Sequence, residues 1–338
     1  MGMVETSGLG STRILKGIYN PFFKNEGIGK IIHDYPEIEF ETVMSAVELD
    51  RAIAGADILI ANNRSYDQDI ASVLQEKGSS LKWIQFSTAG IERAIKFGLP
   101  KGVPVCCAAG IKGRTVAEHT MALLLALYRQ FRAMEAARQR HEWARHELNH
   151  MTRTLEGETL VLIGFGHIGQ EIARKAKAFD MHVVTITRAG GISSTVDEAY
   201  TRDRLHDVLP RADAVVLATA TDITTIGIIG TKELSLMKPT AVLLNMGRGE
   251  LIDERALIDA LRSKRINAAA LDVTEIEPLP PESPLWDLDN VIVSPHISGT
   301  GKDGYGRFKE IFDENFRRFR SGEPLRYLVD WENEPIVK

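Results

Sequence analysis

The sequence predicts an α/β protein with two parallel-sheet domains, and three observations support this prediction. Short apolar segments typical of buried strands alternate with amphipathic segments typical of helices along most of the chain. The chain has 338 residues, which is more than one ordinary hydrophobic core accommodates. A turn with the spacing Gly-x-Gly-x-x-Gly stands between one such strand and one such helix near the middle of the chain.

The glycine-rich turn follows an apolar run at residues 160–163 and precedes a helical pattern. Gly164 permits a tight turn, Gly166 lets the backbone approach a pyrophosphate, and Gly169 lets the helix pack closely on the strand. The amide groups and the positive dipole at the start of the helix then face the anion. Because a second strand follows, the pattern favours a dinucleotide-binding Rossmann unit over an ordinary turn. The residues expected to contact the dinucleotide here are Gly164, Phe165, Gly166, His167, Ile168 and Gly169.

Composition and charge exclude several classes of partner. A net charge of −5 argues against nucleic acid or an anionic membrane surface as the main partner. The longest apolar run, at residues 121–127, is too short to span a bilayer. The two cysteines, Cys106 and Cys107, are adjacent and cannot join distant segments, so we expect a reducing, cytoplasmic location.

No metal site is expected. Three histidines, His141, His146 and His150, lie in a charged stretch between residues 132 and 150. Nothing fixes His141 and His146 on one helical face, and no constellation of cysteines or carboxylates joins them, so a solvated helix face is the better interpretation.

The first hundred residues alternate between strand and helix patterns. This alternation predicts a small parallel α/β domain. The expected strands are 14–19, 38–42, 58–60 and 83–86, and the expected helices are 22–33, 47–54 and 68–75.

The later part of the chain predicts a larger domain with a sheet of about six strands, which is the size of a full dinucleotide domain. A capping-box sequence at residues 115–118 precedes a long apolar helix, in which His119 is expected to be structural. The expected strands are 160–163, 182–186, 212–219, 241–245, 266–271 and 291–293.

A last helix, at residues 304–319, carries one apolar stripe and is expected to dock on the first domain. The stripe consists of Phe308, Ile311, Phe312 and Phe316. The predicted organisation is therefore a dinucleotide-binding domain, residues 113–299, inserted in a flavodoxin-like substrate domain formed by residues 1–112 and 300–338.

Three charged residues each follow one of the later strands. Arg248 lies in Asn-Met-Gly-Arg-Gly, Glu277 precedes a proline, and His296 lies in Ser-Pro-His-Ile-Ser-Gly. Each has an ordinary interpretation alone, as a surface arginine, a turn glutamate or a capping histidine. Together, at the carboxyl ends of strands of one sheet, they predict a carbonyl-reducing site. The arginine holds a substrate carboxylate, the imidazole exchanges the hydroxyl proton, and the glutamate orients the imidazole and favours its protonated form.

These motifs resemble those of the D-isomer-specific 2-hydroxyacid dehydrogenases, and the resemblance runs over nearly the whole chain. It implies that Arg248 binds and polarises a 2-oxo acid, that His296 is the acid and base, and that Glu277 is its partner. It implies further that backbone amides of Ala89 and Gly90 hold the substrate carboxylate, and that Thr115 and Asp272 meet the nicotinamide. A homodimer formed through the cofactor domains is also implied.

The end of the second strand of the Rossmann unit bears on the choice of cofactor. NAD-preferring members of the family place an aspartate where this chain has Thr187, followed by Arg188. An arginine suits the geometry of a phosphate, so we expect NADPH to be the preferred cofactor and NAD the alternative. A plain solvated arginine is the competing interpretation. The proline that many members carry at the position of Ala220 is also missing.

The resemblance implies NADPH-dependent reduction of a small 2-oxo acid, of the glyoxylate or hydroxypyruvate type, to the D-2-hydroxy acid. Formate dehydrogenases share the architecture but carry glutamine in place of Glu277. A dinucleotide-sensing, corepressor-like function on the same fold remains an alternative, because such proteins can keep Arg248, Glu277 and His296. The residues considered for substrate choice are Asn63, Arg64, Trp83 and Trp286.

Overall fold

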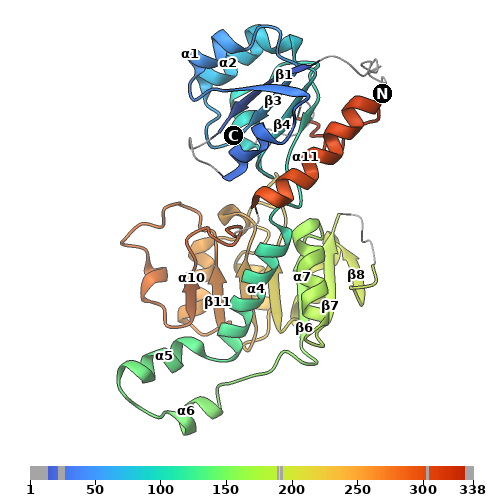
Figure 1. Cartoon of the computed structure of the whole chain (residues 1–338). Coiled ribbons are helices and arrows are strands. Elements are labelled where there is room, and N and C mark those ends of the chain that lie inside the picture. The colour runs from blue at the N-terminus through green and yellow to red at the C-terminus, as the bar shows by residue number, and fades with distance from the viewer. Residues whose placement is uncertain (1–13, 22–26, 189, 191–192, 302–303, 332–338) are drawn as a thin grey trace. The chain divides into compact units, whose positions relative to one another are not determined.

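The computed structural model describes residues 14–21, 27–188, 190, 193–301 and 304–331. The chain divides into two compact units (Figure 1). Unit 1 comprises Met1–Lys112 and Gly301–Lys338, and unit 2 comprises Gly113–Thr300. The chain therefore leaves unit 1 once, forms unit 2 and returns.

Unit 1 contains a five-stranded parallel sheet in the order β2-β1-β3-β4-β5. This is the strand order of flavodoxin-like folds, as the sequence predicts. The short last strand and the helix after β4 were not expected from the sequence. The strands are β1 (Leu15–Asn20), β2 (Ile38–Thr42), β3 (Ile58–Ala61), β4 (Trp83–Phe86) and β5 (Val105–Cys106).

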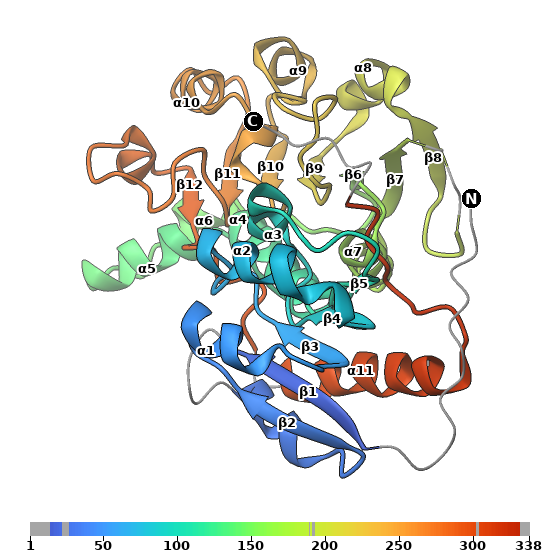
Figure 2. The ribbon, with the colours of Figure 1, turned by 90° about the horizontal axis from the view of Figure 1, so that it is seen from above.

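Helices cover both faces of this sheet (Figure 2). Successive residues of a strand point to opposite faces, so Leu59 packs in one core and Ile58 and Ile60 in the other. The first core is closed by α1 (Ala46–Ala52), α2 (Gln68–Lys77) and α3 (Glu92–Phe97). The second is closed by the 3-10 helix η1 (Gly27–His33) and by α11 (Gly304–Ser321). A helix was expected from residue 22, but residues 22–26 lie outside the described part of the chain.

The last helix docks on unit 1, as predicted. Phe308, Phe312 and Phe316 of α11 are buried in the second core, and Trp83 stacks on Phe312 with ring centroids 5.1 Å apart. Trp83 is fully buried, so its proposal as a substrate-selecting residue is wrong. An apolar strand residue with a large side chain is more often core than site, and that is the case here.

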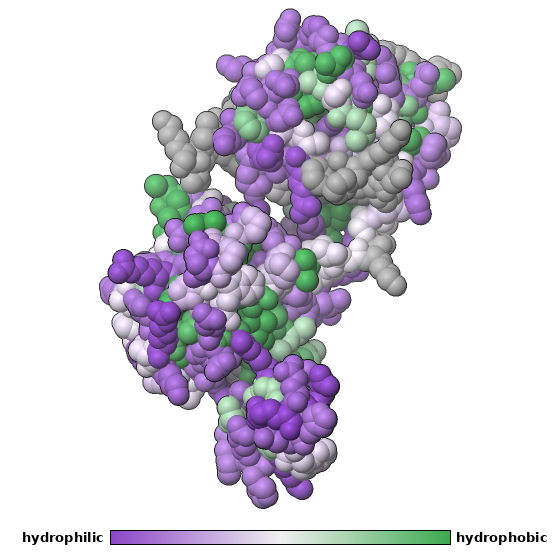
Figure 3. Space-filling model, turned by 90° about the vertical axis from the view of Figure 1, so that its left-hand side faces the viewer, coloured by the Kyte–Doolittle hydropathy of each residue, from purple (hydrophilic) through white to green (hydrophobic). Residues whose placement is uncertain are grey.

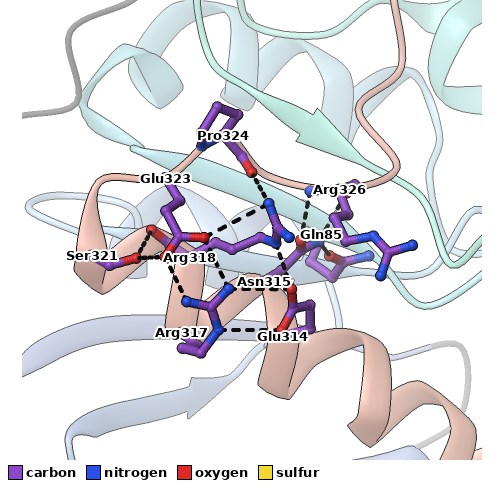
Figure 4. Close-up of polar contacts among 9 residues, drawn as sticks. All are labelled: Gln85, Glu314, Asn315, Arg317, Arg318, Ser321, Glu323, Pro324 and Arg326. Atoms are coloured by element: carbon purple, nitrogen blue, oxygen red, sulfur yellow. Dashed lines mark hydrogen bonds and ion pairs between the residues drawn. The ribbon is translucent and has the colours of Figure 1, made fainter.

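Polar contacts fasten the chain after α11 to the sheet (Figure 4). The buried Asn315 donates through Nδ2 to Oε1 of Gln85 and to the carbonyl of Arg326, at 3.0 Å each, and accepts from the Arg326 amide at 2.8 Å. At the helix end, Arg317 forms an ion pair with Glu323 at 2.6 Å. Asn315 thus satisfies the buried amide of Gln85 and holds the segment that returns beside β5.

Unit 2 contains a seven-stranded parallel sheet in the order β12-β11-β10-β9-β6-β7-β8. From β6, the chain adds two strands on one side and then four on the other, which is the Rossmann arrangement with one extra strand. The prediction of six strands missed β8, whose sequence is polar and only half-buried. The strands are β6 (Thr159–Ile163), β7 (His182–Thr187), β8 (Glu198–Thr201), β9 (Ala214–Leu217), β10 (Val242–Asn245), β11 (Ala268–Leu271) and β12 (Val291–Val293).

Two cores lie on the faces of this sheet. The long apolar helix α4 (Gly113–Tyr128) and α7 (His167–Lys177) cover one face. The other carries α8 (Leu205–Val208), α9 (Thr231–Leu236) and α10 (Glu254–Arg262). The expected capping box at residues 115–118 is wrong, because α4 already begins at Gly113 and Thr115 lies inside its first turn.

Two further helices, α5 (Phe131–Gln139) and α6 (Arg145–Asn149), form an arm that projects from unit 2 at the bottom of Figure 1. Among the described residues, no helix is long and apolar enough to cross a membrane. The same part of the chain contains no group of three His, Cys, Asp or Glu side chains able to hold a metal ion.

Candidate active site

The glycine-rich turn has the geometry that each glycine predicts. Gly164 has φ 103°, and a Cβ there would lie 2.6 Å from the carbonyl oxygen of Ala218. A Cβ on Gly169 would lie 2.4 Å from the Gly164 carbonyl oxygen, so any side chain would push the helix away from the strand. By contrast, no described atom lies within 4 Å of a Cβ built on Gly166. Two glycines are therefore required by packing, and the third borders open space.

Gly166 is also the N-cap residue of α7 and has no side chain to accept hydrogen bonds from the first amides of the helix. His167 beside it is exposed, whereas Phe165 and Ile168 pack partly against the core. Helix starts of this kind bind phosphate through backbone amides and the helix dipole. The residues present thus fit the pyrophosphate of a dinucleotide.

The end of β7 is occupied by Thr187 and Arg188. Thr187 accepts a hydrogen bond from the Gly190 amide through Oγ1 at 2.8 Å. The Arg188 side chain is exposed. In the segment that follows Arg188, Gly191 and Ile192 lie outside the described residues.

Arg248 follows β10 in a loop that the neighbouring residues fix tightly. The buried Asn245 donates to the Arg248 carbonyl at 2.8 Å and accepts from the Gly247 amide at 3.0 Å. A Cβ on Gly249 would lie 2.0 Å from the Thr274 carbonyl oxygen, so this loop packs directly on the loop after β11. Sequence reasoning missed Asn245; a polar residue that closes a buried strand was the available signal.

His296 and Glu277 form a direct pair. His296 Nδ1 and Glu277 Oε2 are 2.7 Å apart, and about half of the imidazole and 38% of the carboxylate side chain are exposed. The contact occupies Nδ1 and leaves Nε2 as the ring nitrogen that faces away from Glu277. Arg248, Glu277 and His296 follow β10, β11 and β12, whose ends are in register, so all three belong to one edge of the sheet.

Asp272 holds the loop that carries His296. Its buried carboxylate accepts from the Ser294 hydroxyl at 2.6 Å, the Ile297 amide at 3.0 Å and the Ser298 amide at 3.2 Å. His296 itself has φ 53°, a conformation that few residues other than glycine adopt, and its amide donates to the Asp272 carbonyl at 2.9 Å. The backbone and side chain of Asp272 together maintain this conformation.

His119 supports the same loop from α4. Its Nε2 lies 2.8 Å from the Ser294 hydroxyl and 3.8 Å from Asp272 Oδ1. His119 therefore has the structural role that the sequence predicts. Thr115, one turn earlier in α4, is half-buried. The sequence did not reveal the contacts of Ser294 with His119 and Asp272, because a serine before a proline occurs in many structural settings.

The candidate substrate loop of unit 1 follows β4. The Thr88 hydroxyl donates to the Gly90 carbonyl at 2.8 Å, and within the described residues no acceptor meets the amides of Ala89 and Gly90. A Cβ on Gly90 would lie 2.6 Å from a carboxylate oxygen of Glu92. Sequence reasoning assigned no role to Glu92. This loop offers two amide donors to an anion.

The other candidates for substrate choice lie elsewhere in the two units. Asn63 accepts from the Arg93 and Ala94 amides, at 3.1 and 3.2 Å, and thereby begins α3. Arg64 is exposed, and Trp286, 48% exposed, donates to the Pro280 carbonyl at 2.9 Å. Asn63 is thus partly occupied by a structural role.

Fold and site together define a dinucleotide-binding protein of the Rossmann class with an arginine and a histidine–glutamate pair at the carboxyl edge of its sheet. Residues 121–298 match the family model of the D-isomer specific 2-hydroxyacid dehydrogenase, NAD binding domain. Over 314 residues the chain is 34% identical to a D-3-phosphoglycerate dehydrogenase of Methanocaldococcus jannaschii, covering 91% of this chain and 58% of that protein. It is 35% identical over 243 residues to a glyoxylate reductase of Pyrococcus furiosus, covering 70% of this chain and 71% of that protein.

A solved structure gives the same result. An NADPH-dependent glyoxylate/hydroxypyruvate reductase from Sinorhizobium meliloti, in complex with NADP and sulfate, aligns with a TM-score of 0.81 and 26% identity. The alignment covers 94% of this chain and 99% of that one. The chain belongs to the D-isomer specific 2-hydroxyacid dehydrogenase family, a family of oxidoreductases, and carries its NAD-binding domain.

Proposed function

We propose that the protein reduces a small 2-oxo acid to the D-2-hydroxy acid with NADPH, with unit 2 binding the cofactor. The observation that carries the proposal is the 2.7 Å pair between His296 and Glu277, at the same strand edge as Arg248. A glyoxylate reductase at 35% identity and a glyoxylate/hydroxypyruvate reductase at 26% support the substrate class.

When bound, a nicotinamide cofactor supplies the hydride that reduces C2 of the substrate. Arg248 pairs with the substrate carboxylate and polarises the 2-oxo group. His296 gives its Nε2 proton to the oxygen that becomes the hydroxyl, and Glu277 at Nδ1 stabilises the imidazolium before transfer. From the resemblance, the amides of Ala89 and Gly90 are further donors to the substrate carboxylate, and Thr115 borders the nicotinamide.

NADPH is proposed over NADH because the end of β7 offers Thr187 and Arg188 in place of an acidic residue. A carboxylate there accepts hydrogen bonds from the ribose hydroxyls and repels a 2′-phosphate, whereas an exposed guanidinium attracts it. A charged hydrogen bond contributes about 1.5–3 kcal/mol, so kcat/KM should favour NADPH by roughly 10- to 150-fold. Arg188→Ala should remove most of this ratio, chiefly by weakening NADPH. Equal use of both cofactors by the unmodified protein would refute the assignment.

A turnover panel tests the function itself. Purified protein is mixed with NADPH or NADH and with glyoxylate, hydroxypyruvate, 3-phosphohydroxypyruvate or pyruvate. A separate assay with formate and NADP or NAD tests the formate dehydrogenase alternative. Turnover of a small 2-oxo acid that is lost in His296→Ala supports the proposal. Cofactor binding without turnover of any acid would favour the dinucleotide-sensing alternative.

We propose further that the protein is a cytoplasmic homodimer joined through the cofactor units. The arm formed by α5 and α6 carries exposed Phe131, Met134 and Trp143, and Trp143 is 92% exposed. The lobe at the bottom of Figure 3 combines a mostly hydrophilic surface with a smaller hydrophobic area. Apolar side chains on a projecting arm are typical of an interface between copies. Sedimentation of the wild type and of Trp143→Ser tests this, and a monomeric wild type would refute it.

A further inference from the structure

A second arginine lies at the same sheet edge as Arg188. Strands β7 and β8 are neighbours, with Thr187 in register with Thr201, so Arg188 and Arg202 each follow directly after one of two adjacent strand ends. A Cβ on Gly190 would lie 3.4 Å from the Thr201 side chain, so Gly190 lies against the end of β8. The two guanidinium groups therefore start from neighbouring positions.

The Arg202 side chain crosses the sheet edge toward the centre. Its Nη1 donates to the Thr224 hydroxyl, and its Nη2 lies 3.8 Å from Asp222 Oδ2, both in the loop after β9. Because β7 and β6 stand between β8 and β9, these partners start roughly 14 Å apart, or three strand spacings of about 4.8 Å. One arginine side chain covers only part of that span, and the loop covers the rest. Their contact therefore joins the loop after β9 to the end of β8, two strands that β6 and β7 separate.

The ends of β7 and β6 carry Thr187 and the glycine-rich turn, where the adenosine half of a dinucleotide binds in this fold.

The loop that meets Arg202 is held by its own hydrogen bonds. Asp222 accepts from the Thr224 amide at 2.7 Å and from the Thr224 hydroxyl, and the buried Thr225 hydroxyl donates to the Ala220 carbonyl at 3.0 Å. Hydrogen bonding by Thr224, and then the charge of Arg202, keep the pKa of Asp222 below its usual value.

The Arg202 guanidinium is thus fixed in place, but these contacts do not use all of its hydrogen-bond donors. An arginine has five N–H donors, and the contact with Thr224 uses one of them. The Arg202 side chain is 23% exposed, which leaves it accessible from the sheet edge. Arg188 and Arg202 together carry one more charge than the Asp222 carboxylate that Arg202 approaches. This combination suits a dianionic phosphate monoester.

We propose that Arg202 is a second residue that binds the 2′-phosphate of NADPH, together with Arg188. The inference rests on the proposed function. Thr224 and Asp222 hold the guanidinium in advance, so little side-chain entropy is lost when the phosphate binds. The loop after β9 lacks the proline common in the family at Ala220, and here its Asp222 and Thr224 serve this arginine instead.

The test is calorimetric titration of the full chain with 2′,5′-ADP and with 5′-AMP, two probes that differ by the phosphate in question. Arg202→Gln should weaken 2′,5′-ADP roughly 10- to 150-fold, the range for a lost charged hydrogen bond, and leave 5′-AMP within about threefold. The matched control is Arg204→Gln. Arg204 lies two residues later in the same turn and pairs with Asp207 at 2.6 Å, so its loss should change neither affinity.

The two levels of the proposal fail in different ways. If the unmodified protein binds neither probe, the dinucleotide function itself is wrong. If it prefers 2′,5′-ADP and Arg202→Gln leaves that preference intact, only the role of Arg202 is wrong. An equal loss of both probes would show that Arg202 shapes the adenosine pocket and does not bind the phosphate. A selective loss in the Arg188→Ala background as well would confirm that both arginines contribute.

Discussion

A single methyl group placed on Gly249 should disturb both the stability of unit 2 and the position of Arg248. In Gly249→Ala the new Cβ would lie 2.0 Å from the Thr274 carbonyl oxygen and 2.5 Å from the Glu275 amide nitrogen. Both neighbours are backbone atoms of the loop that leads to Glu277, so neither can swing aside as a flexible side chain can. The loop of Arg248 and the loop of Glu277 must therefore separate.

Overpacking of this kind typically costs about 1–3 kcal/mol. For a unit of this size, such a loss lowers the melting temperature by roughly 2–12 °C. The displacement also moves Arg248 relative to His296, and misplacement by about 1 Å can reduce turnover by about 100-fold. We expect both losses in one variant. Thermal unfolding followed by circular dichroism and steady-state 2-oxo acid reduction measure them.

Gly166→Ala is the matched control, because no described atom lies within 4 Å of its added Cβ. It should leave the melting temperature of the cofactor-free protein unchanged and weaken dinucleotide binding, since the methyl group occupies the approach of the pyrophosphate. A Gly249→Ala protein with wild-type stability and turnover would show that these two loops do not constrain each other. The reasoning from their packing would then be wrong.

Four further outcomes are expected. His296→Ala should lower kcat by roughly 10²–10⁴-fold and leave the cofactor Kd unchanged, whereas Arg248→Ala should raise KM and lower kcat. Glu277→Gln should lower kcat by roughly 10- to 150-fold. Steady-state kinetics and cofactor titration distinguish these outcomes. Near-wild-type turnover by His296→Ala would remove it from the mechanism. The Arg211 guanidinium holds the pKa of Glu198 at about 2, so this pair stabilises the fold at neutral pH and the contribution is lost as pH falls from about 4.5 through 2. Glu198→Gln should therefore lose less stability than the wild type between about pH 5 and 2 in acid titrations by circular dichroism, and parallel curves would contradict this.

The sequence predicts the fold well where a pattern has one structural meaning. Buried parallel strands such as β6 and β10 are continuous apolar runs, and their positions were found within a residue or two. Strand β8 was missed because it is an edge strand whose residues are polar and only half-buried. The start of α4 was misplaced because a capping-box sequence also fits the first turn of a helix that begins two residues earlier.

The site was predictable only in part, and the reason is geometric. Charged residues after strand ends can be found in the sequence, which is how Arg248, Glu277 and His296 were chosen. The contacts that hold their loops are of two kinds: Asn245 donates to the carbonyl of Arg248 within one loop, and Asp272 accepts from residues around His296 that lie far along the chain. Such hydrogen bonds depend on how loops fold back, and residue type alone does not reveal them. Trp83 illustrates the opposite error, because a large aromatic residue on a buried strand belongs to the core.

Asp272 offers the last prediction, since its sequence-based role and its observed contacts differ. The family resemblance implies that Asp272 meets the nicotinamide, whereas in the structure its carboxylate accepts from the Ser294 hydroxyl and from two amides next to His296. Asp272→Asn keeps one acceptor oxygen and turns an amide donor toward other donors, which costs about 1–3 kcal/mol for the unmet buried group. We expect a lower melting temperature and a fall in kcat, with the cofactor Kd within about threefold of the wild type. A cofactor Kd that rises as much as kcat falls would show instead that Asp272 acts through the cofactor and not through the loop of His296.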